Sequence, residues 1–284
     1  MQLNNQAAIR LLRQPLEAQS ETASQDAQVL LSHVLDKPRA WVLTHSDERL
    51  NAEQIKHLQR VTRRLESGEP LPYILGHWEF YGLNFSVSPA VLIPRPETEI
   101  LVEYALSWLA DHPARRRAVD VGTGSGCIAV TLASLVPELR VLAVDISWPA
   151  LRIARQNITR HQLAGRIPLA QLDLLAGLHP PPHHRFDMIC ANLPYIPQRT
   201  LETLDQLRWE PRTALSGGRS GSEPIQRMLR DLPQVIAPGG LLLLEIEASL
   251  GAAIHNRVRE VLPGADVQVL PDLAGQDRLV VAQT

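Results

Sequence analysis

The segment AVDVGTGSGCIAV, residues 118–130, is a short apolar run that leads into three glycines at alternate positions. The apolar run is typical of a buried strand, and the residues after Gly126 fit the start of a helix. Glycines between a strand and a helix let the backbone turn sharply and approach a ligand closely, and the helix start offers unpaired N–H groups. The segment therefore predicts a strand, a helix and, between them, a loop for a nucleotide-like ligand formed by Gly122, Gly124 and Gly126.

The spacing of these glycines separates several kinds of nucleotide-binding loop. The dinucleotide fingerprint is G-x-G-x-x-G, whereas this loop has the sequence G-T-G-S-G, which disfavours a cradle for a pyrophosphate. Lys followed by Ser or Thr, which a nucleoside triphosphate loop requires, does not follow the glycines. For the glycines taken alone, a purely structural turn is the alternative.

Two aspartates follow the next two apolar runs. Asp145, in AVDIS, comes about 20 residues after the glycine loop, where a carboxylate can accept hydrogen bonds from both hydroxyls of a ribose. Asp173, in QLDLL, is placed to accept from an adenine amino group while Leu174 packs against the base. Each aspartate by itself fits a cap of the following helix equally well.

Beyond Glu97 the chain alternates between strand and helix patterns. Right-handed crossovers between parallel strands give an open sheet covered on both faces, with the ligand crevice at the carboxyl ends of the strands. We therefore predict an α/β fold with a Rossmann-like, mostly parallel sheet. The predicted strands are 118–121, 141–144, 167–171, 186–191 and 241–246.

The first part of the chain has a different pattern. Apolar residues recur at helical intervals from Leu3 to about Ser67, and Gly68 with two following prolines ends this pattern. Aromatic and β-branched residues then alternate with polar ones around Gly82 and Asn84, which predicts a hairpin. We divide the chain into a small helical domain (1–69), a β-hairpin connector (70–96) and an α/β domain (97–284).

The composition predicts a folded, soluble protein. Of the 284 residues 45% are hydrophobic and 20% charged, and the net charge of -2 gives no general attraction to nucleic-acid phosphates. No leader pattern and no apolar run of membrane-spanning length is found, so we expect a cytoplasmic protein without membrane contact.

The cysteines and histidines do not predict a metal or redox site. Cys127 and Cys190 are far apart and are expected in the core. His179, His183 and His184 lie in the proline-rich stretch HPPPHHR, which predicts a solvated loop and no metal site.

Taken together, these motifs resemble those of class I S-adenosylmethionine-dependent methyltransferases. The resemblance is carried by DVGTGSG at 120–126, by the two aspartates, and by NLPY at 192–195, which is similar to the N-P-P-Y acceptor motif. It implies S-adenosylmethionine as cofactor and a seven-stranded sheet whose last strand, at 277–282, is antiparallel. The cofactor-binding residues that it implies are Asp120, Gly122, Thr123, Gly124, Ser125, Gly126, Asp145, Asp173, Leu174 and Asn192.

Three further segments resemble one branch of these enzymes, the release factor glutamine methyltransferases of the HemK/PrmC family. The segments are LPYILGHWEFYGLNFSVSPAVLIPRPETE (71–99), RWEPRTAL (208–215) and DLAGQDR (272–278). The resemblance implies transfer of a methyl group to the side-chain amide nitrogen of the glutamine in the GGQ motif of peptide chain release factors. It also implies a monomer that does not contact nucleic acid directly. The helical domain would then dock the protein substrate, because one glutamine in a flexible loop gives little binding energy.

The NLPY motif suits the chemistry of an amide nucleophile. The lone pair of an amide nitrogen is delocalised, so a catalytic site has to orient the nitrogen and favour its tetrahedral geometry. The side-chain oxygen of Asn192 and the backbone carbonyl of Leu193 would each accept one N–H hydrogen, while Pro194 stiffens the turn and Tyr195 stacks on the amide. Leu193 stands where the family usually has proline, so the carbonyl acceptor is kept and proline's rigidity is lost. A simple turn after a strand is the alternative.

Arg95 and Glu97, in IPRPETE, are further candidates for substrate binding. They would contact either the methionine end of the cofactor or the incoming glutamine. Alternatively, Glu97 and Glu99 serve only the first turn of the following helix, where acidic side chains interact favourably with the helix dipole.

Three other functions fit parts of the same sequence. An adenine-N6 DNA methyltransferase faces the same problem of orientation, but it has to flip a base and hold phosphates, and the chain lacks a basic domain for this. A glutamine methyltransferase of a ribosomal protein shares the chemistry, but RPETE resembles the release-factor branch more closely. A nucleotide-binding module without catalysis would leave Asn192 unexplained.

Overall fold

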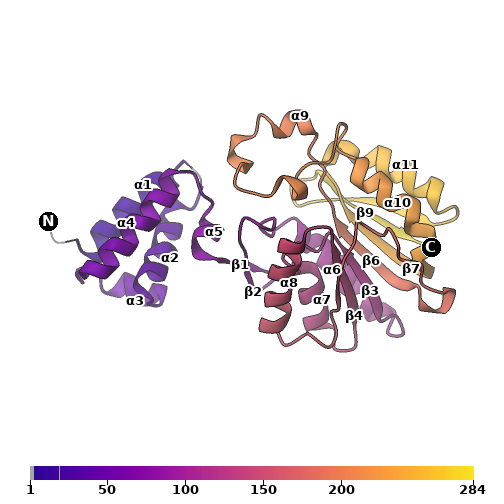
Figure 1. Cartoon of the computed structure of the whole chain (residues 1–284), viewed down its shortest axis with the longest axis horizontal. Helices are drawn as coiled ribbons and strands as arrows, with labels where there is room; N and C mark the ends of the chain where they lie inside the picture. Colours follow the sequence, from indigo (N-terminus) through magenta and orange to yellow (C-terminus); the bar gives the residue numbers. More distant parts are fainter. Residues whose placement is uncertain (1–2, 19) are drawn as a thin grey trace. The chain divides into compact units, whose positions relative to one another are not determined.

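The computed structural model describes residues 3–18 and 20–284, and the chain divides into two compact units, one up to His77 and one from Trp78 to Thr284. Figure 1 labels the helices and strands of both units. Within the described residues no helix combines the length and the apolar character that crossing a membrane requires.

The first unit is helical. Its longest helix begins with a capping box, in which the Asn51 side chain accepts from the Gln54 N–H and the Gln54 side chain accepts from the Asn51 N–H. Leu58 and Leu65, seven residues apart and so on the same face of α4, are buried where the helix packs against its neighbours. The helices are α1 (Asn5–Leu16), α2 (Ala23–Leu35), α3 (Arg39–Thr44), α4 (Ala52–Glu66) and α5 (Leu71–Leu75).

The segment after α4 differs partly from the sequence pattern. A hairpin of β1 (His77–Phe80) and β2 (Leu83–Ser86) lies where the alternation around Gly82 predicts it. The residues before it are not extended but form α5, because Pro72 lies in its first turn and Gly76 ends it with a φ of +76°.

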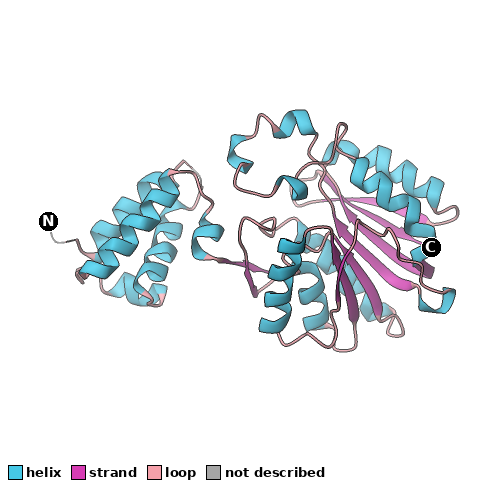
Figure 2. Ribbon diagram, in the orientation of Figure 1, coloured by secondary structure: helices cyan, strands magenta, loops and turns pink. Residues whose placement is uncertain are grey.

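The second unit is a seven-stranded sheet with helices on both faces (Figure 2). The strand order is β5-β4-β3-β6-β7-β9-β8, and β9 alone runs antiparallel to its neighbours, so the predicted open sheet is confirmed. The strands are β3 (Arg117–Val121), β4 (Arg140–Asp145), β5 (Leu169–Gln171), β6 (Phe186–Asn192), β7 (Ile236–Glu245), β8 (Asp266–Pro271) and β9 (Asp277–Gln283). The helices are α6 (Thr98–Asp111), α7 (Cys127–Leu135), α8 (Trp148–Arg160), α9 (Gln198–Leu201), α10 (Glu223–Val235) and α11 (Gly251–Val261).

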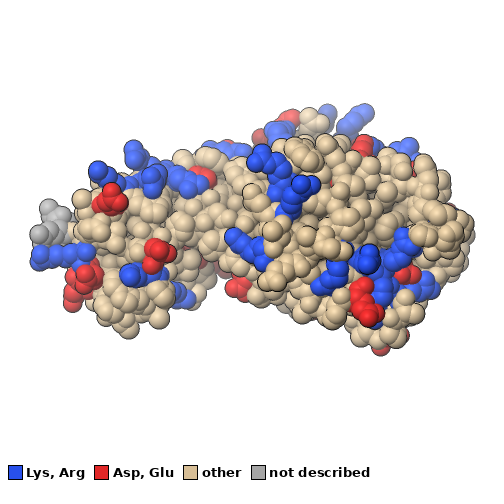
Figure 3. All heavy atoms as spheres, turned by 60° about the horizontal axis from the view of Figure 1, so that its bottom comes forward, with Lys and Arg blue, Asp and Glu red and all other residues tan. Residues whose placement is uncertain are grey.

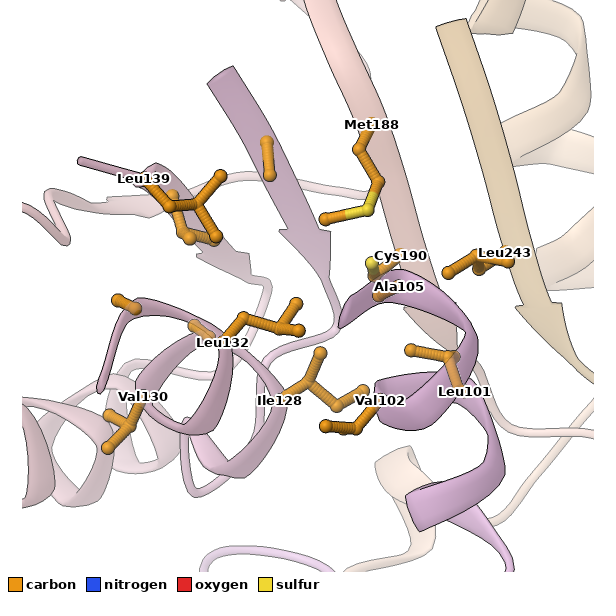
Figure 4. Packing of buried hydrophobic residues seen from close by; sticks show 14 of the residues in the cluster. Leu101, Val102, Ala105, Ile128, Val130, Leu132, Leu139, Met188, Cys190 and Leu243 are labelled. Atoms are coloured by element: carbon orange, nitrogen blue, oxygen red, sulfur yellow. The ribbon is translucent and has the colours of Figure 1, made fainter. Parts of the chain in front are cut away.

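Both faces of this sheet are apolar, and successive residues of a strand pack on opposite faces. In β7, Leu241 and Leu243 belong to the core formed with α6 and α7, whereas Leu242 belongs to the core formed with α10 and α11. Figure 4 shows the first core, where side chains of α6 and α7, among them Leu101 and Ile128, lie against β6 and β7.

The strand order reverses between β3 and β6. The chain leaves β3 toward β4 on one side and leaves β6 toward β7 on the other, which opens a crevice at their carboxyl ends. Val121 and Ala191 are partners in the parallel register, so Gly122, which follows β3, lies beside Asn192, the last residue of β6.

One buried amide ties the hairpin to the loop after β3. Asn157 of α8 has no exposed surface, and its Oδ1 accepts from the Ser86 N–H at 2.7 Å. Its Nδ2 donates to the carbonyls of Ser86 at 3.0 Å and Ser125 at 2.8 Å. Three backbone groups from distant segments are therefore satisfied by one side chain.

We expect Asn157→Ala to lower the free energy of unfolding by roughly 2–4 kcal/mol, because it leaves buried backbone groups of Ser86 and Ser125 without partners. Urea unfolding followed by circular dichroism measures this change. Arg160→Ala is the matched control, since it removes only an exposed bond from the same helix to Asn84. An unchanged urea midpoint in the Asn157 variant would contradict the prediction.

Candidate active site

A cavity of about 260 Å³ opens at the carboxyl ends of β3 to β6. Eight of the ten predicted cofactor-binding residues line it. Those from the loop after β3 are Gly122, Thr123, Gly124 and Ser125, and the others are Asp145, Asp173, Leu174 and Asn192. The sheet thus brings together residues that are widely spaced in the sequence.

The other two predicted residues, Asp120 and Gly126, do not line the cavity; Asp120 lies in β3 and Gly126 is the N-cap of α7. The Asp120 carboxylate is 1% exposed and accepts from the Thr123 hydroxyl at 2.6 Å and from the Ala129 N–H at 3.3 Å. Burial raises its pKa to about 6. Asp120 therefore holds the glycine loop from below. Its Oδ1 is buried without a hydrogen-bond partner among the described residues.

Gly122 brings the loop as close as possible to the end of β6. It has a φ of +72°, and a Cβ there would lie 3.1 Å from Leu193 Cδ2 and 3.7 Å from the Asn192 carbonyl oxygen. Leu193 itself is buried in the core with α10. The absence of a side chain at Gly122 therefore lets the loop approach the end of β6 this closely.

Asp145 joins β4 to the glycine loop. Its Oδ2 accepts from the Gly124 N–H at 2.9 Å and its Oδ1 from the Ser147 N–H at 2.8 Å. The cap of α8 comes instead from the Ser147 hydroxyl, which accepts from the Ala150 N–H. Burial raises the pKa of Asp145.

Asp173 and Leu174 form the wall that follows β5. The Asp173 carboxylate pairs with Arg227 of α10, which also lines the cavity. Leu174 has a φ of +59°, which is unusual for a leucine and sets the direction of its side chain.

A second cavity, of about 190 Å³, adjoins the first. Asn192, Leu193 and Pro194 line both cavities, as do Leu92, Arg95 and Ala214. Tyr195 lines the second cavity and not the first. Burial raises the pKa of its hydroxyl to about 12, so the hydroxyl stays neutral. The NLPY motif is therefore the partition between two adjacent cavities.

Arg95 is held by a residue that sequence reasoning missed. It pairs with the carboxylate of Glu210, which is 5% exposed and also accepts from the Ile93 N–H at 3.1 Å. Glu210 lies within RWEPRTAL, but nothing in the local pattern signals that its charge is buried. Glu97 is exposed, lines neither cavity and makes no side-chain cap of α6. Glu99 instead accepts from the Tyr81 N–H at 2.8 Å.

A buried chain of hydrogen bonds starts at Asn192. Its Nδ2 donates to the Thr98 hydroxyl at 3.0 Å, and this hydroxyl donates to Glu245 at 2.7 Å. Burial raises the pKa of the Glu245 carboxyl to about 7. Sequence reasoning missed both partners, although a charged residue that ends an apolar strand was the available signal.

The cysteines differ from one another. Cys190 is buried in the core as predicted, whereas Cys127 begins α7, is partly exposed and lines the first cavity. It is not purely a core residue, because the helix start faces the cavity. Burial raises the pKa of Cys127 to about 12 and that of Cys190 well above its ordinary value, so both thiols stay protonated. In the described parts of the chain no cluster of three metal-ligating side chains occurs.

This sheet order, with a cavity between the glycine loop and the end of β6, belongs to a class I methyltransferase, which uses S-adenosylmethionine as its cofactor. Family models agree: one described as "Methyltransferase small domain" matches residues 98–210, and one described as "PrmC N-terminal domain" matches residues 7–76. A methyltransferase structure from Pyrococcus furiosus shares the fold with a TM-score of 0.53 and 18% identity, over 79% of this chain and 98% of that one.

Curated relatives narrow the class. A release factor glutamine methyltransferase of Koribacter versatilis is 42% identical over 260 residues, which is 90% of each chain. One of Moorella thermoacetica is 41% identical over 258 residues, again 90% of each chain. The chain belongs to the release factor glutamine methyltransferase family.

The raised pKa of Glu245 gives a prediction about stability. The carboxyl binds its proton more tightly in the folded protein than in the unfolded chain, so the free energy of unfolding falls as pH rises from 4.5 to about 7. Glu245→Gln removes the titrating carboxyl, and with it this fall in the free energy of unfolding. We expect the variant to be more stable than the parent at pH 8, by roughly 3 kcal/mol at most, with no such gain below pH 4.5.

Thermal or urea unfolding of both proteins across this pH range measures the difference. A gain that is the same at pH 4.5 and pH 8 would show that proton binding at Glu245 does not cause it.

Proposed function

We propose that the protein transfers a methyl group from S-adenosylmethionine to the side-chain amide nitrogen of the glutamine in the GGQ motif of peptide chain release factors. The observation that supports this most is the partition formed by Asn192, Leu193 and Pro194 between two adjacent cavities. The first cavity takes the cofactor and the second takes the glutamine side chain. Transfer then occurs across the end of β6.

In the first cavity, the proposed contacts follow from the chemistry of each wall. The Asp145 carboxylate accepts from the ribose hydroxyls, since two carboxylate oxygens offer about four acceptor sites and the backbone donors of Gly124, Ser147 and Ile146 do not fill them all. Asp173 accepts from the adenine amino group and Leu174 packs against the base. The cofactor supplies an electrophilic methyl group on a sulfonium. The glycine loop lies beside the cofactor, since Gly122, Thr123, Gly124 and Ser125 line this cavity.

In the second cavity, the acceptor amide is oriented by two oxygens. The Asn192 Oδ1 and the Leu193 carbonyl each accept one N–H hydrogen, which points the nitrogen lone pair toward the first cavity. Tyr195 stacks on the planar amide and excludes water, and Pro194 stiffens the turn between them. Arg95, fixed by Glu210, contacts the substrate at the rim shared by both cavities.

Glu97 stands just before the first helical residue of α6 and makes no side-chain cap there. We assign it to the rim that meets the release factor, because it is exposed and close in sequence to Arg95.

We further propose a cytoplasmic monomer that contacts neither membrane nor nucleic acid directly. The net charge of -2 supports this. On the face drawn in Figure 3, Lys and Arg side chains lie in separate groups among acidic and uncharged atoms.

The substrate is tested by incubating the protein with labelled S-adenosylmethionine and, separately, a release factor, the ribosomal proteins or DNA. We expect label in the release factor, and its loss when the GGQ glutamine is replaced by alanine. Label in ribosomal protein or in DNA adenine, with none in the release factor, would assign one of the two alternative functions instead.

Asn192→Ala is expected to bind S-adenosylmethionine nearly normally and to transfer methyl groups at least ~100-fold more slowly, since it loses one preorganised contact to the reacting nitrogen. Calorimetry and single-turnover methylation measure the two quantities. Asp145→Ala is the matched control, because it should weaken cofactor binding instead. Its binding free energy for the cofactor should fall by roughly 1.5–3 kcal/mol for each lost hydrogen bond to the charged acceptor. Methylation by the Asn192 variant at the parental rate would refute the role of Asn192.

The helical unit is proposed to dock the release factor, since it supplies none of the residues that line either cavity. A protein that lacks residues 1–76 should keep its cofactor affinity and lose most release-factor methylation, because binding energy away from the amide is lost. Calorimetry and the methylation assay on the soluble truncated protein decide this. Undiminished methylation would refute docking, and joint loss of both activities would indicate that the helices only stabilise the catalytic unit.

A further inference from the structure

We propose that Thr98 and Glu245 are positioning residues that fix the rotation of the Asn192 side-chain amide, so that its oxygen and not its nitrogen faces the acceptor glutamine. The inference rests on the proposed function, in which this oxygen accepts a hydrogen from the glutamine amide. Thr98 is the first residue of α6 and Glu245 the last of β7, so neither lies in the NLPY motif.

The direction of the hydrogen bonds follows from counting protons. An ionised carboxylate only accepts, so the Thr98 hydroxyl has to give its single proton to Glu245, at 2.7 Å. The Thr98 oxygen is then left with lone pairs only, and it accepts from Asn192 at 3.0 Å. The group of Asn192 that meets Thr98 must therefore be its NH₂, which turns Oδ1 away from Thr98.

When Glu245 is ionised, burial makes this arrangement the only satisfied one. Thr98 is 2% exposed and Glu245 1%, so water does not replace either partner. A reversed Asn192 amide would bring its oxygen against the lone pairs of Thr98. It would also present N–H donors to the N–H donors of the glutamine. The buried pair therefore selects the amide orientation that the proposed transfer requires.

The selection depends on the ionised form of Glu245. A protonated Glu245 can donate to Thr98, which frees the Thr98 proton for Asn192 and allows the amide to reverse. Arg278 and Arg95 favour the ionised form and Glu97 opposes it, while burial raises the pKa of Glu245 to about 7. The other ionisable groups that interact with Glu245 are Tyr195 and Cys127, whose own pKa values are raised to about 12 and which stay neutral near pH 7.

The first test compares Thr98→Val with Thr98→Ser. Valine keeps the size and removes the hydroxyl, so kcat for release-factor methylation should fall at least ~10-fold while KM and the affinity for S-adenosylmethionine stay within about 2-fold. Serine keeps the hydroxyl and should restore most of kcat. Parental kcat in the valine variant, failure of serine to restore it, or a loss confined to KM would each overturn the proposal.

A double variant separates this inference from the proposed function. Thr98→Val should slow Asn192→Ala no further, because Thr98 acts only through the amide that the alanine has removed. An additional loss of ~10-fold or more in the double variant would overturn the positioning role. Full activity of Asn192→Ala alone would instead contradict the proposed function.

The second test uses Glu245→Gln, whose neutral side chain resembles protonated Glu245 at every pH. The parental kcat should fall as pH drops through about 7, whereas the variant should start lower at pH 8.5 and stay flat to pH 6, where the two rates converge. Matching low-pH decreases in both proteins, or equal rates at pH 8.5, would overturn the role of Glu245.

Discussion

The active site depends on how closely the loop after β3 approaches the end of β6. Val121 pairs with Ala191 in parallel register, and a Cβ on Gly122 would lie only 3.1 Å from the Leu193 side chain. The two cavities therefore share one thin partition, and its position is set by strand pairing in the middle of a sheet. A central sheet is the least deformable part of such a fold, so under the proposed function the distance between methyl donor and acceptor is set by the sheet and not by mobile loops.

Buried polar side chains attach the remaining walls to this frame. Glu210 holds Arg95 and the backbone of Ile93, Asn157 holds the hairpin and the glycine loop, and Glu245 holds the start of α6 through Thr98. A buried acceptor or amide costs free energy unless its partners are in place, so each one specifies a single arrangement of segments far apart in the sequence. Hydrophobic packing alone would tolerate small shifts between these segments.

Much of the fold could be predicted because its signals are local. A buried strand, a glycine turn and a helix follow one another within 118–130, and the acidic residues stand directly after their strands. Strand β7 begins at Ile236, whereas the predicted strand begins at 241. The prediction starts too late because Pro238 and the two glycines after it are not typical of a strand. Strand β5 is shorter than predicted, covering only Leu169–Gln171, and β8 carries too mixed a pattern to be recognised.

The buried pairs could not be predicted, for a physical reason. Glu210 and Arg95, or Thr98 and Glu245, are more than a hundred residues apart, and only the folded sheet brings them together. Asp145 and Asp173 were ambiguous for a related reason, since a carboxylate after a strand can cap a helix or face a ligand. For Asp145 the structure answers the question of the cap alone, since the side chain that caps α8 is Ser147.

The few ionisable groups in the second cavity agree with the proposal that the site works by orienting the acceptor amide and not by removing its proton. Among the described residues that line the second cavity, only Arg95 and Tyr195 carry ionisable side chains. Arg95 is paired with Glu210, and the high pKa of Tyr195 keeps it a neutral phenol. Neither acts as a general base near neutral pH, and an amide needs none, because its nitrogen becomes acidic only after it is methylated. Glu245 reaches the cavity only through Thr98 and Asn192. Under the proposed mechanism, protons therefore affect the reaction through the direction in which the Asn192 amide points.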